Sequence, residues 1–278
     1  MSDSNANGTP PTVIFFGESG AGKSSIINML DGGQDATVSD QATGVTFSIS
    51  SYQKTINKST FTIFDTIGLN EGSRGTVKAR HAVRRLYNLM CRLDDGVNLL
   101  VYVMQQPRIK QTAELNYKLF YEIFCQMKVP IGIVITGLEH RDNMDGWWGE
   151  NQSSFDKYGM KFAGHACITT IKGRSKNGKY YYQNEYDESK RAVEDLIVNL
   201  CKIPWKMERG MWFREVIDGI LGIFELNRDD RRKQLARALQ KYGGMSGTAA
   251  RAEARNIELQ RIGEQREQEQ KQRNEERQ

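Results

Sequence analysis

The most constraining feature of this sequence is an eight-residue segment near its N-terminus. Residues Gly17 to Ser24 read G-E-S-G-A-G-K-S and fit the pattern G-x-x-x-x-G-K-S. The residues just before it, Val13 to Phe16, are all apolar, as expected of a short buried strand. A strand, a glycine-rich loop and a helix that begins at Lys23 are what a phosphate-binding loop (P-loop) requires. We therefore predict that the chain binds a nucleoside triphosphate, and the alternative is a chance glycine-rich turn.

Backbone geometry explains why this segment suits phosphate. Glycines let successive N–H groups point at phosphate oxygens, and the helix N-terminus adds the positive end of its dipole. Lys23 is expected to reach the β- and γ-phosphates, and the Ser24 hydroxyl is expected to bind Mg²⁺. The predicted nucleotide contacts in this segment are Gly17, Glu18, Ser19, Gly20, Ala21, Gly22, Lys23, Ser24 and Ser25.

Length and composition suggest one sizeable domain with additions at both ends. The chain has 278 residues, 38% of them hydrophobic, and most residues after Asn227 are polar or charged. Because such a composition cannot bury a core, we expect truncation after Asn227 to leave nucleotide affinity unchanged. The predicted division is a disordered N-terminus at 1–11, a nucleotide-binding domain at 12–203, an amphipathic helical segment at 204–227, and a charged helical or disordered tail at 228–278.

Charge, cysteine content and the N-terminus limit the class of protein. The net charge is a modest +5, and from Arg228 onward there are 13 Lys/Arg, 9 Asp/Glu and one aromatic residue, so we do not expect nucleic acid as a partner of this protein. The N-terminus has no import signal, so we expect a soluble cytoplasmic protein, with peripheral membrane association as the alternative. The four cysteines are widely spaced, without a C-x-x-C pair, and are expected to be small core residues: Cys91, Cys125, Cys167 and Cys201.

Strand-like and helix-like periodicities alternate from residue 12 to about 203. This alternation predicts an α/β fold in which a mainly parallel sheet carries helices on both faces. The one antiparallel pair is expected at Thr46–Ile56 and Thr60–Asp65, which are joined by Asn57-Lys58. Three further strands are predicted at Val97–Met104, Pro130–Thr136 and His165–Ile168.

The second phosphate-side motif is Asp65-Thr66-Ile67-Gly68, which fits D-x-x-G directly after a strand. Asp65 is expected in the Mg²⁺ shell, and the Gly68 amide is expected to bind the γ-phosphate. Thr46 is the candidate for a threonine that closes over Mg²⁺ and the γ-phosphate. Thr43 is its rival, and the third alternative is that both are ordinary loop threonines.

The sequence Thr136-Gly137-Leu138-Glu139 follows an apolar strand and is the candidate base-reading motif. The Glu139 carboxylate would accept hydrogen bonds from the guanine N1–H and exocyclic amine. Adenine has no donor at N1, so a carboxylate favours guanine by about 1.5–3 kcal/mol per charged hydrogen bond. Thr169 and Thr170 follow the next strand and are expected beside the guanine carbonyl. The alternative is that Glu139 is a surface residue.

Together these motifs resemble the septin-like branch of P-loop GTPases, and especially the GTPases of immunity-associated proteins. The resemblance covers residues 12 to about 203. Gly68 is followed by Leu69, where Ras-like proteins have a water-orienting glutamine, and Arg108 occupies the place of a box typical of the immunity-associated family. Pro107 and Gly137 depart from the family pattern. The resemblance implies a G domain that binds GTP or GDP with Mg²⁺.

The predicted function is slow, Mg²⁺-dependent hydrolysis of GTP, promoted by formation of a homodimer across the nucleotide face. Since Leu69 cannot orient water, Arg108 is expected to act in trans as an arginine finger, which is worth about 10³–10⁵ in rate. Arg74 is the rival finger, and a plain surface role for Arg108 is the other alternative. The competing functions are a structural GTP-binding scaffold with negligible turnover and an ATP-using P-loop enzyme.

Two aromatic segments have alternative interpretations. Trp147-Trp148 belongs to an expected helix that packs on the G domain, with a partner-facing patch as the alternative. Residues 204–278 are expected to provide protein or membrane contact, because Trp205 to Phe224 has the spacing of an apolar helical face. The simpler alternative is a helix docked on the G domain.

Overall fold

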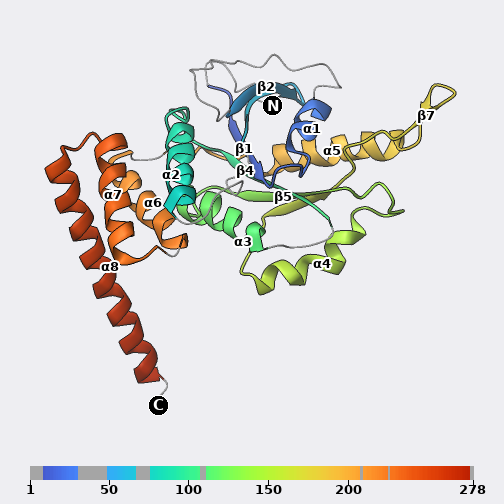
Figure 1. The fold of residues 1–278 in the computed structure, drawn as a ribbon. Helices are drawn as coiled ribbons and strands as arrows, with labels where there is room; N and C mark the ends of the chain where they lie inside the picture. Colours follow the sequence, from blue (N-terminus) through green and yellow to red (C-terminus); the bar gives the residue numbers. More distant parts are fainter. Residues whose placement is uncertain are drawn as a thin grey trace. The chain divides into compact units, whose positions relative to one another are not determined.

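The computed structural model describes residues 9–30, 49–66, 76–106, 111–206, 209–224 and 226–275 (Figure 1). These residues fall into two compact units. The first lies within residues 1–71 and 89–207, and the second lies within residues 72–88 and 208–278.

A six-stranded sheet with the strand order β2-β3-β1-β4-β5-β6 forms the centre of the first unit. Every neighbouring pair is parallel except β2 and β3, which run antiparallel. The predicted α/β fold with one antiparallel pair is therefore confirmed. The strands are β1 (Thr12–Gly17), β2 (Ser50–Ile56), β3 (Ser59–Asp65), β4 (Leu99–Gln105), β5 (Ile131–Thr136) and β6 (Gly164–Cys167).

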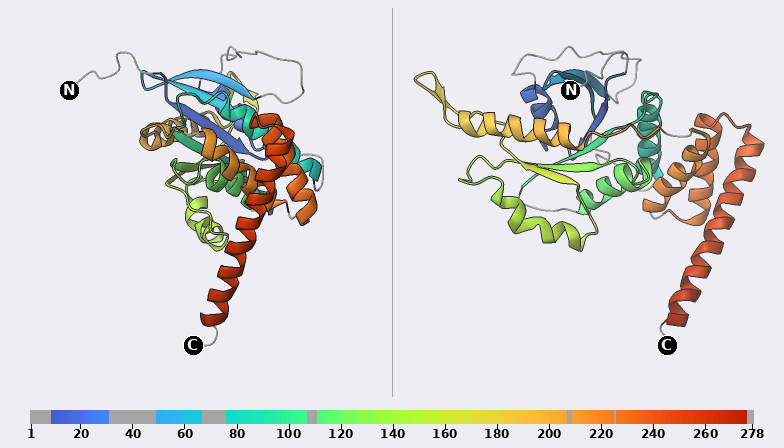
Figure 2. Two further views of the ribbon diagram at one scale, coloured as in Figure 1. Left: turned by 90° about the vertical axis from the view of Figure 1, so that its left-hand side faces the viewer. Right: turned by 180° about the vertical axis from the view of Figure 1, so that it is seen from behind.

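Helices cover both faces of this sheet, which explains why its central strands are continuous apolar runs. All six residues of β1 and of β5 are buried. Helices α1 and α5 lie on one face, and α3 and α4 lie on the other (Figures 1 and 2). The helices of this unit are α1 (Lys23–Leu30), α3 (Gln111–Tyr117) with its π-helical continuation η1 (Lys118–Phe124), α4 (Gly146–Lys157) and α5 (Gln183–Leu200).

Phe16 illustrates the packing on the face that α3 and η1 cover. Its ring stacks on Tyr102 of β4 at 4.8 Å and on Phe120 of η1 at 4.5 Å between ring centroids. Phe15, one residue earlier, belongs to the core on the opposite face, together with Ile27 of α1 and Val193 of α5. Because side chains alternate between the two faces of β1, this strand contributes to a hydrophobic core on each side of the sheet.

Two paired glycines set how closely α5 approaches the sheet. Gly132 of β5 and Gly164 of β6 lie opposite each other in the ladder. A Cβ atom at Gly132 would lie 3.1 Å from Cδ1 of Leu200, and one at Gly164 would lie 3.0 Å from Cδ1 of Leu196. Both leucines belong to α5, so the absence of side chains at these two strand positions lets the helix pack closely against the sheet.

The two tryptophans of α4 pack on the first unit, as predicted. Trp147 is buried, and Trp148 stacks on His165 of β6 with 4.8 Å between ring centroids. His165 also contacts the Asp145 carboxylate at 3.0 Å. The α4 tryptophans therefore hold this helix against the edge of the sheet.

The cysteines follow the sequence expectation only in part. Cys125 and Cys167 are buried, and burial raises the pKa of the Cys167 thiol to about 12. Cys201 is half-buried, whereas Cys91 is exposed. The expectation of a core position is therefore wrong for Cys91, because the residue follows the last turn of α2 (Thr76–Met90) and its neighbour Met90 takes the buried position.

The second unit consists of helices. They are α2 (Thr76–Met90) as far as Asn88, α6 (Arg209–Ile223), α7 (Arg228–Tyr242) and α8 (Gly247–Glu275). The rings of Tyr87 in α2 and Tyr242 in α7 lie 4.6 Å apart. None of the helices that the structure describes is both long and apolar enough to cross a bilayer.

The expectation that residues after Asn227 cannot bury a core is wrong. Leu235, Ala238 and Leu239 of α7 and Ala250 and Ala254 of α8 are buried. Alanines suffice here because small side chains let two helices approach closely along one face. Helix α7 also begins with a cap, since the Asn227 side chain accepts a 2.9 Å hydrogen bond from the Asp230 amide. Residues 228–258 are therefore part of a packed unit, whereas most described residues of α8 after Glu258 are exposed.

Buried charges connect three helices of this unit. Arg231 of α7 is 3% exposed, and its guanidinium donates to the Asp218 carboxylate and, at 3.1 Å, to the Asp218 main-chain carbonyl. The Arg231 Nε lies 3.3 Å from Glu258 of α8, a residue that is 4% exposed. Arg261 contacts the same carboxylate at 3.4 Å. An ionic cluster thus fixes α6, α7 and α8 to one another.

Candidate nucleotide-binding site

The loop between β1 and α1 has a backbone that only glycine adopts without strain at three positions, Gly17, Gly20 and Gly22. Gly17 has φ +146°, and a Cβ there would collide with the main-chain oxygen of Val103 in β4. Gly22 has φ +97°, and a Cβ there would lie 3.3 Å from Cγ2 of Thr136 and 3.6 Å from Cγ2 of Thr170. The predicted phosphate loop is thus enclosed by β4 and by the two segments predicted to read the base.

Lys23 begins α1 and lies over this loop. Its Nζ donates to the carbonyl oxygen of Gly17 at 3.1 Å and to that of Glu18 at 2.8 Å, and the side chain is 7% exposed. The first turn of α1 leaves N–H groups without partners inside the helix, and these carry the positive end of the helix dipole. An ammonium group and a helix N-terminus therefore meet at the loop, where they favour an anion.

Ser24 and Asp65 form the metal side of the site. Strands β1 and β3 are parallel neighbours with Phe15 opposite Asp65, so the ends of both strands lie at one edge of the sheet. The Ser24 hydroxyl donates a 2.6 Å hydrogen bond to Oδ2 of Asp65. Burial raises the pKa of Asp65 above its ordinary value of 3.8, while the Ser24 hydrogen bond and the Lys23 charge act in the opposite direction.

These oxygens fit a magnesium ion. Mg²⁺ prefers hard oxygen ligands and commonly uses one or two protein groups together with substrate phosphates and water. Among the described residues, no group of three or more His, Cys, Asp or Glu side chains is arranged to hold a metal ion. Ser24 and Asp65 would therefore hold the ion jointly with ligand oxygens.

Thr136, at the end of β5, connects the base side to the phosphate loop. Its hydroxyl donates a 2.8 Å hydrogen bond to the carbonyl oxygen of Ala21. Gly137 follows with φ +84°. Gln106, after β4, supports this turn: its side-chain amide donates to the Gly137 carbonyl, and its main-chain amide donates to the Thr136 carbonyl at 3.1 Å. The sequence motifs gave no signal for Gln106.

Glu139 and Thr169, predicted separately for the base side, are in contact. The Thr169 hydroxyl donates to Oε2 of Glu139 at 3.2 Å. The Thr169 amide in turn donates at 3.0 Å to the hydroxyl of Ser189, a buried residue of α5. Ser189 was not predicted, because a lone serine within a helix has no recognisable pattern. The carboxylate of Glu139 is therefore held by the loop after β6 and by α5.

Several predicted site residues lie outside the described part of the chain. Their assignments remain predictions: Thr43, Thr46, Gly68, Leu69, Arg74, Pro107 and Arg108.

One family of known proteins matches the first part of the chain. The sequence profile of a family described as "50S ribosome-binding GTPase" matches residues 12–136. This range runs from the first residue of β1 to the last residue of β5 and includes the P-loop, Asp65 and Thr136. No curated protein matches the chain.

Solved structures of several GTPases are similar at low sequence identity. Toc33 from Arabidopsis thaliana is 19% identical with a TM-score of 0.47, covering 71% of this chain and 88% of that one. Era from Aquifex aeolicus, bound to GDP·AlF4⁻, is 14% identical with a TM-score of 0.45, covering 71% of this chain and 57% of Era. A GTP-binding protein from Sulfolobus solfataricus in complex with GDP is 13% identical with a TM-score of 0.41, covering 67% of this chain and 53% of that one.

The chain thus spans little more than half of the Era and Sulfolobus proteins. The family match over residues 12–136, the strand order and the loop geometry agree with one another. The α/β part of this chain has the G-domain fold of P-loop GTPases.

Proposed function

We propose that this protein binds Mg²⁺·GTP and hydrolyses it slowly. The observation that carries the proposal is the convergence of three segments on the P-loop: Ser24 contacts Asp65, Thr136 contacts Ala21, and Thr170 lies beside Gly22. A triphosphate in this loop would have the metal-binding side chains at one end and the base-side segments at the other.

The preference for guanine rests on Glu139. A carboxylate accepts hydrogen bonds from the N1–H and exocyclic amine of guanine, whereas adenine offers no donor at N1. The Thr169 hydroxyl uses one oxygen of Glu139, so the carboxylate retains acceptor capacity for a base. Since the Thr169 amide already donates to Ser189, the main-chain amide of Thr170 would be the one to face the guanine carbonyl.

Each group of the site has a distinct role in phosphate chemistry. The loop amides and Lys23 would bind the phosphate oxygens, and Ser24 and Asp65 would hold Mg²⁺. When bound, Mg²⁺ neutralises negative charge that develops on the transferred phosphoryl group. Leu69 follows Gly68 and has no group to orient water, which supports a low intrinsic rate.

The first test compares nucleotides. Labelled GTP and ATP are titrated against the wild type, the Glu139→Ala variant and the Lys23→Ala variant. We expect tighter binding of GTP, at least a tenfold loss of GTP affinity with little change for ATP in Glu139→Ala, and loss of both nucleotides in Lys23→Ala. Equal affinity of the wild type for GTP and ATP would remove the guanine assignment.

The finer part of the proposal is a septin-like mechanism, in which two G domains meet across their nucleotide faces and Arg108 acts in trans. It is supported by the position of Arg108 after the fourth strand and by Leu69, since another group must then stabilise the transition state. Specific activity should rise with protein concentration in the wild type and should be low in Arg108→Ala. Mixing that variant with Lys23→Ala, which keeps Arg108, should restore turnover.

Specific activity that does not change with protein concentration, in a protein that stays monomeric with GTP bound, would contradict the trans mechanism. So would wild-type activity in Arg108→Ala. Tight GTP binding without measurable turnover at any concentration would favour the scaffold function in place of the enzyme.

A further inference from the structure

The segment between β6 and α5 has an unusual composition. Residues 171–182 read I-K-G-R-S-K-N-G-K-Y-Y-Y, with four Lys/Arg, three tyrosines and no Asp or Glu. Part of it forms a two-stranded hairpin, β7 (Ser175–Lys176) and β8 (Lys179–Tyr180), which the sequence analysis did not predict. The turn residues Asn177 and Gly178 have φ +54° and +77°, as the tight turn of a type I′ hairpin requires.

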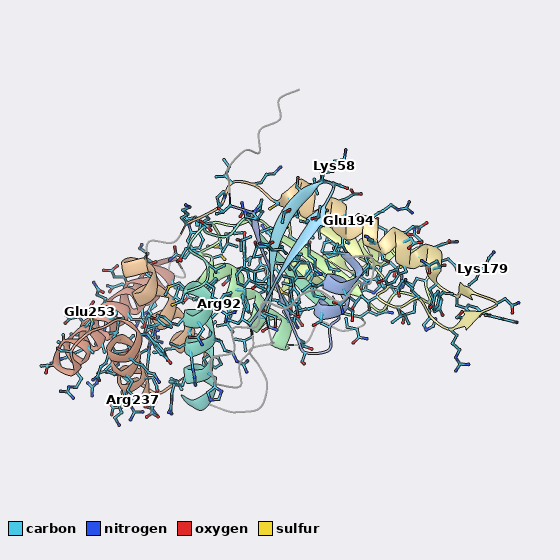
Figure 3. The ribbon with its side chains drawn as sticks, turned by 90° about the horizontal axis from the view of Figure 1, so that it is seen from above. Lys58, Arg92, Lys179, Glu194, Arg237 and Glu253 are labelled. Carbon is cyan, nitrogen blue, oxygen red and sulfur yellow. The ribbon has the colours of Figure 1, made fainter. Side chains whose placement is uncertain are left out.

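The register of the hairpin places its cations on one face. Ser175 pairs with Tyr180 and Lys176 pairs with Lys179, while the Tyr181 amide donates to the Arg174 carbonyl at 3.0 Å. Because side chains alternate between faces along a strand, one face carries Arg174, Lys176, Lys179 and Tyr181. Lys179 lies at the far end of the hairpin (Figure 3).

This face is unfavourable for folding on its own. Like charges that lie directly opposite each other on neighbouring strands repel, and Lys176 and Lys179 are such a pair. Among the residues that the structure describes, neither of these lysines nor Arg174 forms an ion pair. Tyr181 is 74% exposed. Aromatic and cationic side chains that are exposed, and whose placement does not stabilise the fold, indicate a binding surface.

The base of the hairpin is fixed to the domain. The Tyr182 hydroxyl contacts Nδ1 of His140 at 3.1 Å, and the Tyr182 amide donates to the Lys172 carbonyl at 2.9 Å. The Lys172 ammonium lies 4.8 Å from the centre of the Tyr186 ring in α5. The cationic face is therefore presented in a defined direction beside the segment that carries Glu139.

We propose that this hairpin binds single-stranded nucleic acid. Arg174, Lys176 and Lys179 would contact backbone phosphates, and Tyr181 would stack on a base. A positively charged groove or strip combined with an exposed aromatic ring is how proteins hold single strands without sequence preference. Residues two apart on a strand are about 6.6 Å apart, so one strand can place successive cations along a polyanion.

Two other anionic partners fit the hairpin less well. A membrane-binding hairpin carries apolar residues at its tip, whereas this tip is Asn177-Gly178 between two lysines. An acidic protein would satisfy the cations but would give Tyr181 no base to stack on. The sequence-based expectation that nucleic acid is not a partner rested on the modest net charge and on residues 228–278, where Tyr242 is the one aromatic residue, and the hairpin differs from that tail in its three adjacent tyrosines.

The test uses the full chain and a fluorescently labelled 12-nucleotide oligouridine, with affinity measured by anisotropy from 50 to 300 mM salt. The variant Lys176→Glu/Lys179→Glu is compared with Lys233→Glu/Lys271→Glu, which changes the net charge equally at exposed positions of α7 and α8. We expect at least a tenfold loss of affinity in the hairpin variant and less than a twofold loss in the control. The slope of log K against log salt should fall by about 1.4, since each phosphate contact on a single strand contributes about 0.7.

Stacking is tested separately with Tyr181→Ala and Tyr181→Phe. We expect at least a fivefold loss of affinity in the alanine variant and almost none in the phenylalanine variant. Equal losses in the two double variants, or equal losses at Tyr181, would overturn the proposal. Binding to vesicles of phosphatidylserine and phosphatidylcholine without oligouridine binding would overturn it in favour of a membrane surface. GTP affinity is measured in parallel, so failure of this inference remains distinct from failure of the proposed function.

Discussion

The hydroxyl of Thr136 and the carbonyl oxygen of Ala21 are joined by a 2.8 Å hydrogen bond across 115 residues of sequence. This bond fixes the last residue of β5 to the middle of the P-loop, and so it sets the position of the base-side turn relative to the phosphates.

We expect Thr136→Val to weaken GTP binding about fivefold, because it removes a hydrogen bond worth about 1 kcal/mol while keeping the shape of the side chain. Titration with a fluorescent GTP analogue measures the change. Thr136→Ser keeps the hydroxyl and serves as the control, which should bind within twofold of wild type. Identical affinity of the valine variant would mean that the bond does not position the site.

Gly17 and Gly20 form a matched pair for backbone strain. Both have positive φ, but a Cβ at Gly17 collides with the main chain of β4, whereas a Cβ at Gly20 meets nothing within 4 Å. We expect Gly17→Ala to cost at least about 3 kcal/mol of unfolding free energy and Gly20→Ala only about 1 kcal/mol. Urea unfolding of the nucleotide-free protein measures both. Similar costs would show that β4 moves aside.

Asp65→Asn should stabilise the nucleotide-free protein near neutral pH. The pKa of Asp65 is raised in the folded state, so the folded protein binds this proton more tightly than the unfolded chain does. The contribution of Asp65 to stability therefore falls as pH rises from its ordinary pKa of 3.8 through the raised value, and it stays low above that value. Asparagine does not titrate, so the variant should unfold at a higher temperature than wild type at pH 7, with the difference shrinking at acidic pH.

With Mg²⁺ and GTP present, the wild type should instead unfold at a higher temperature than Asp65→Asn, because only the wild type keeps a carboxylate for the ion. Ligand at 100 times its dissociation constant stabilises a protein by about 2.7 kcal/mol. Thermal unfolding with and without Mg²⁺·GTP measures this gain. An equal gain in the asparagine variant would contradict a metal-binding role for Asp65.

Glu258→Gln should destabilise the second unit by about 2 kcal/mol, since it removes one of the two carboxylates beside the buried Arg231 and leaves Asp218 as the remaining partner. Glu258 and Arg231 are both nearly inaccessible. Arg273→Ala is the control, because its pair with Glu269 is exposed and should contribute less than about 0.5 kcal/mol. Unfolding is followed by circular dichroism, and equal effects would show that the ionic cluster adds no stability.

Local patterns were sufficient to predict the strands and the P-loop. The run Val13 to Phe16 is apolar because β1 is covered on both faces, and Asp65 reaches Ser24 because parallel neighbours end at the same edge. Both facts follow from general rules of α/β sheets. The described part of β2 begins at Ser50, and residues 46–48 of the predicted strand lie outside the described part of the chain.

Contacts between distant segments were not predictable from one sequence. The assignment of residues 76–88 to a unit with α6, α7 and α8 depends on packing such as that of Tyr87 on Tyr242. The buried role of Arg231 was also missed, because its charge was counted as solvated. The β7–β8 hairpin did have a local signal, Asn177-Gly178, but its strands are too short to show alternation.

Gly132 and Gly164 let α5 pack closely on the sheet, and α5 also contacts the loop after β6 on the base side of the site. The same helix carries Ser189, whose hydroxyl accepts a hydrogen bond from the Thr169 amide. The Thr169 hydroxyl in turn donates to the Glu139 carboxylate. A Cβ atom at either glycine would press on the Leu196 and Leu200 side chains of this helix, which would have to give way by a few tenths of an ångström. We therefore expect substitutions at these two glycines to affect the guanine preference proposed for Glu139, although both positions lie in the interior of the sheet.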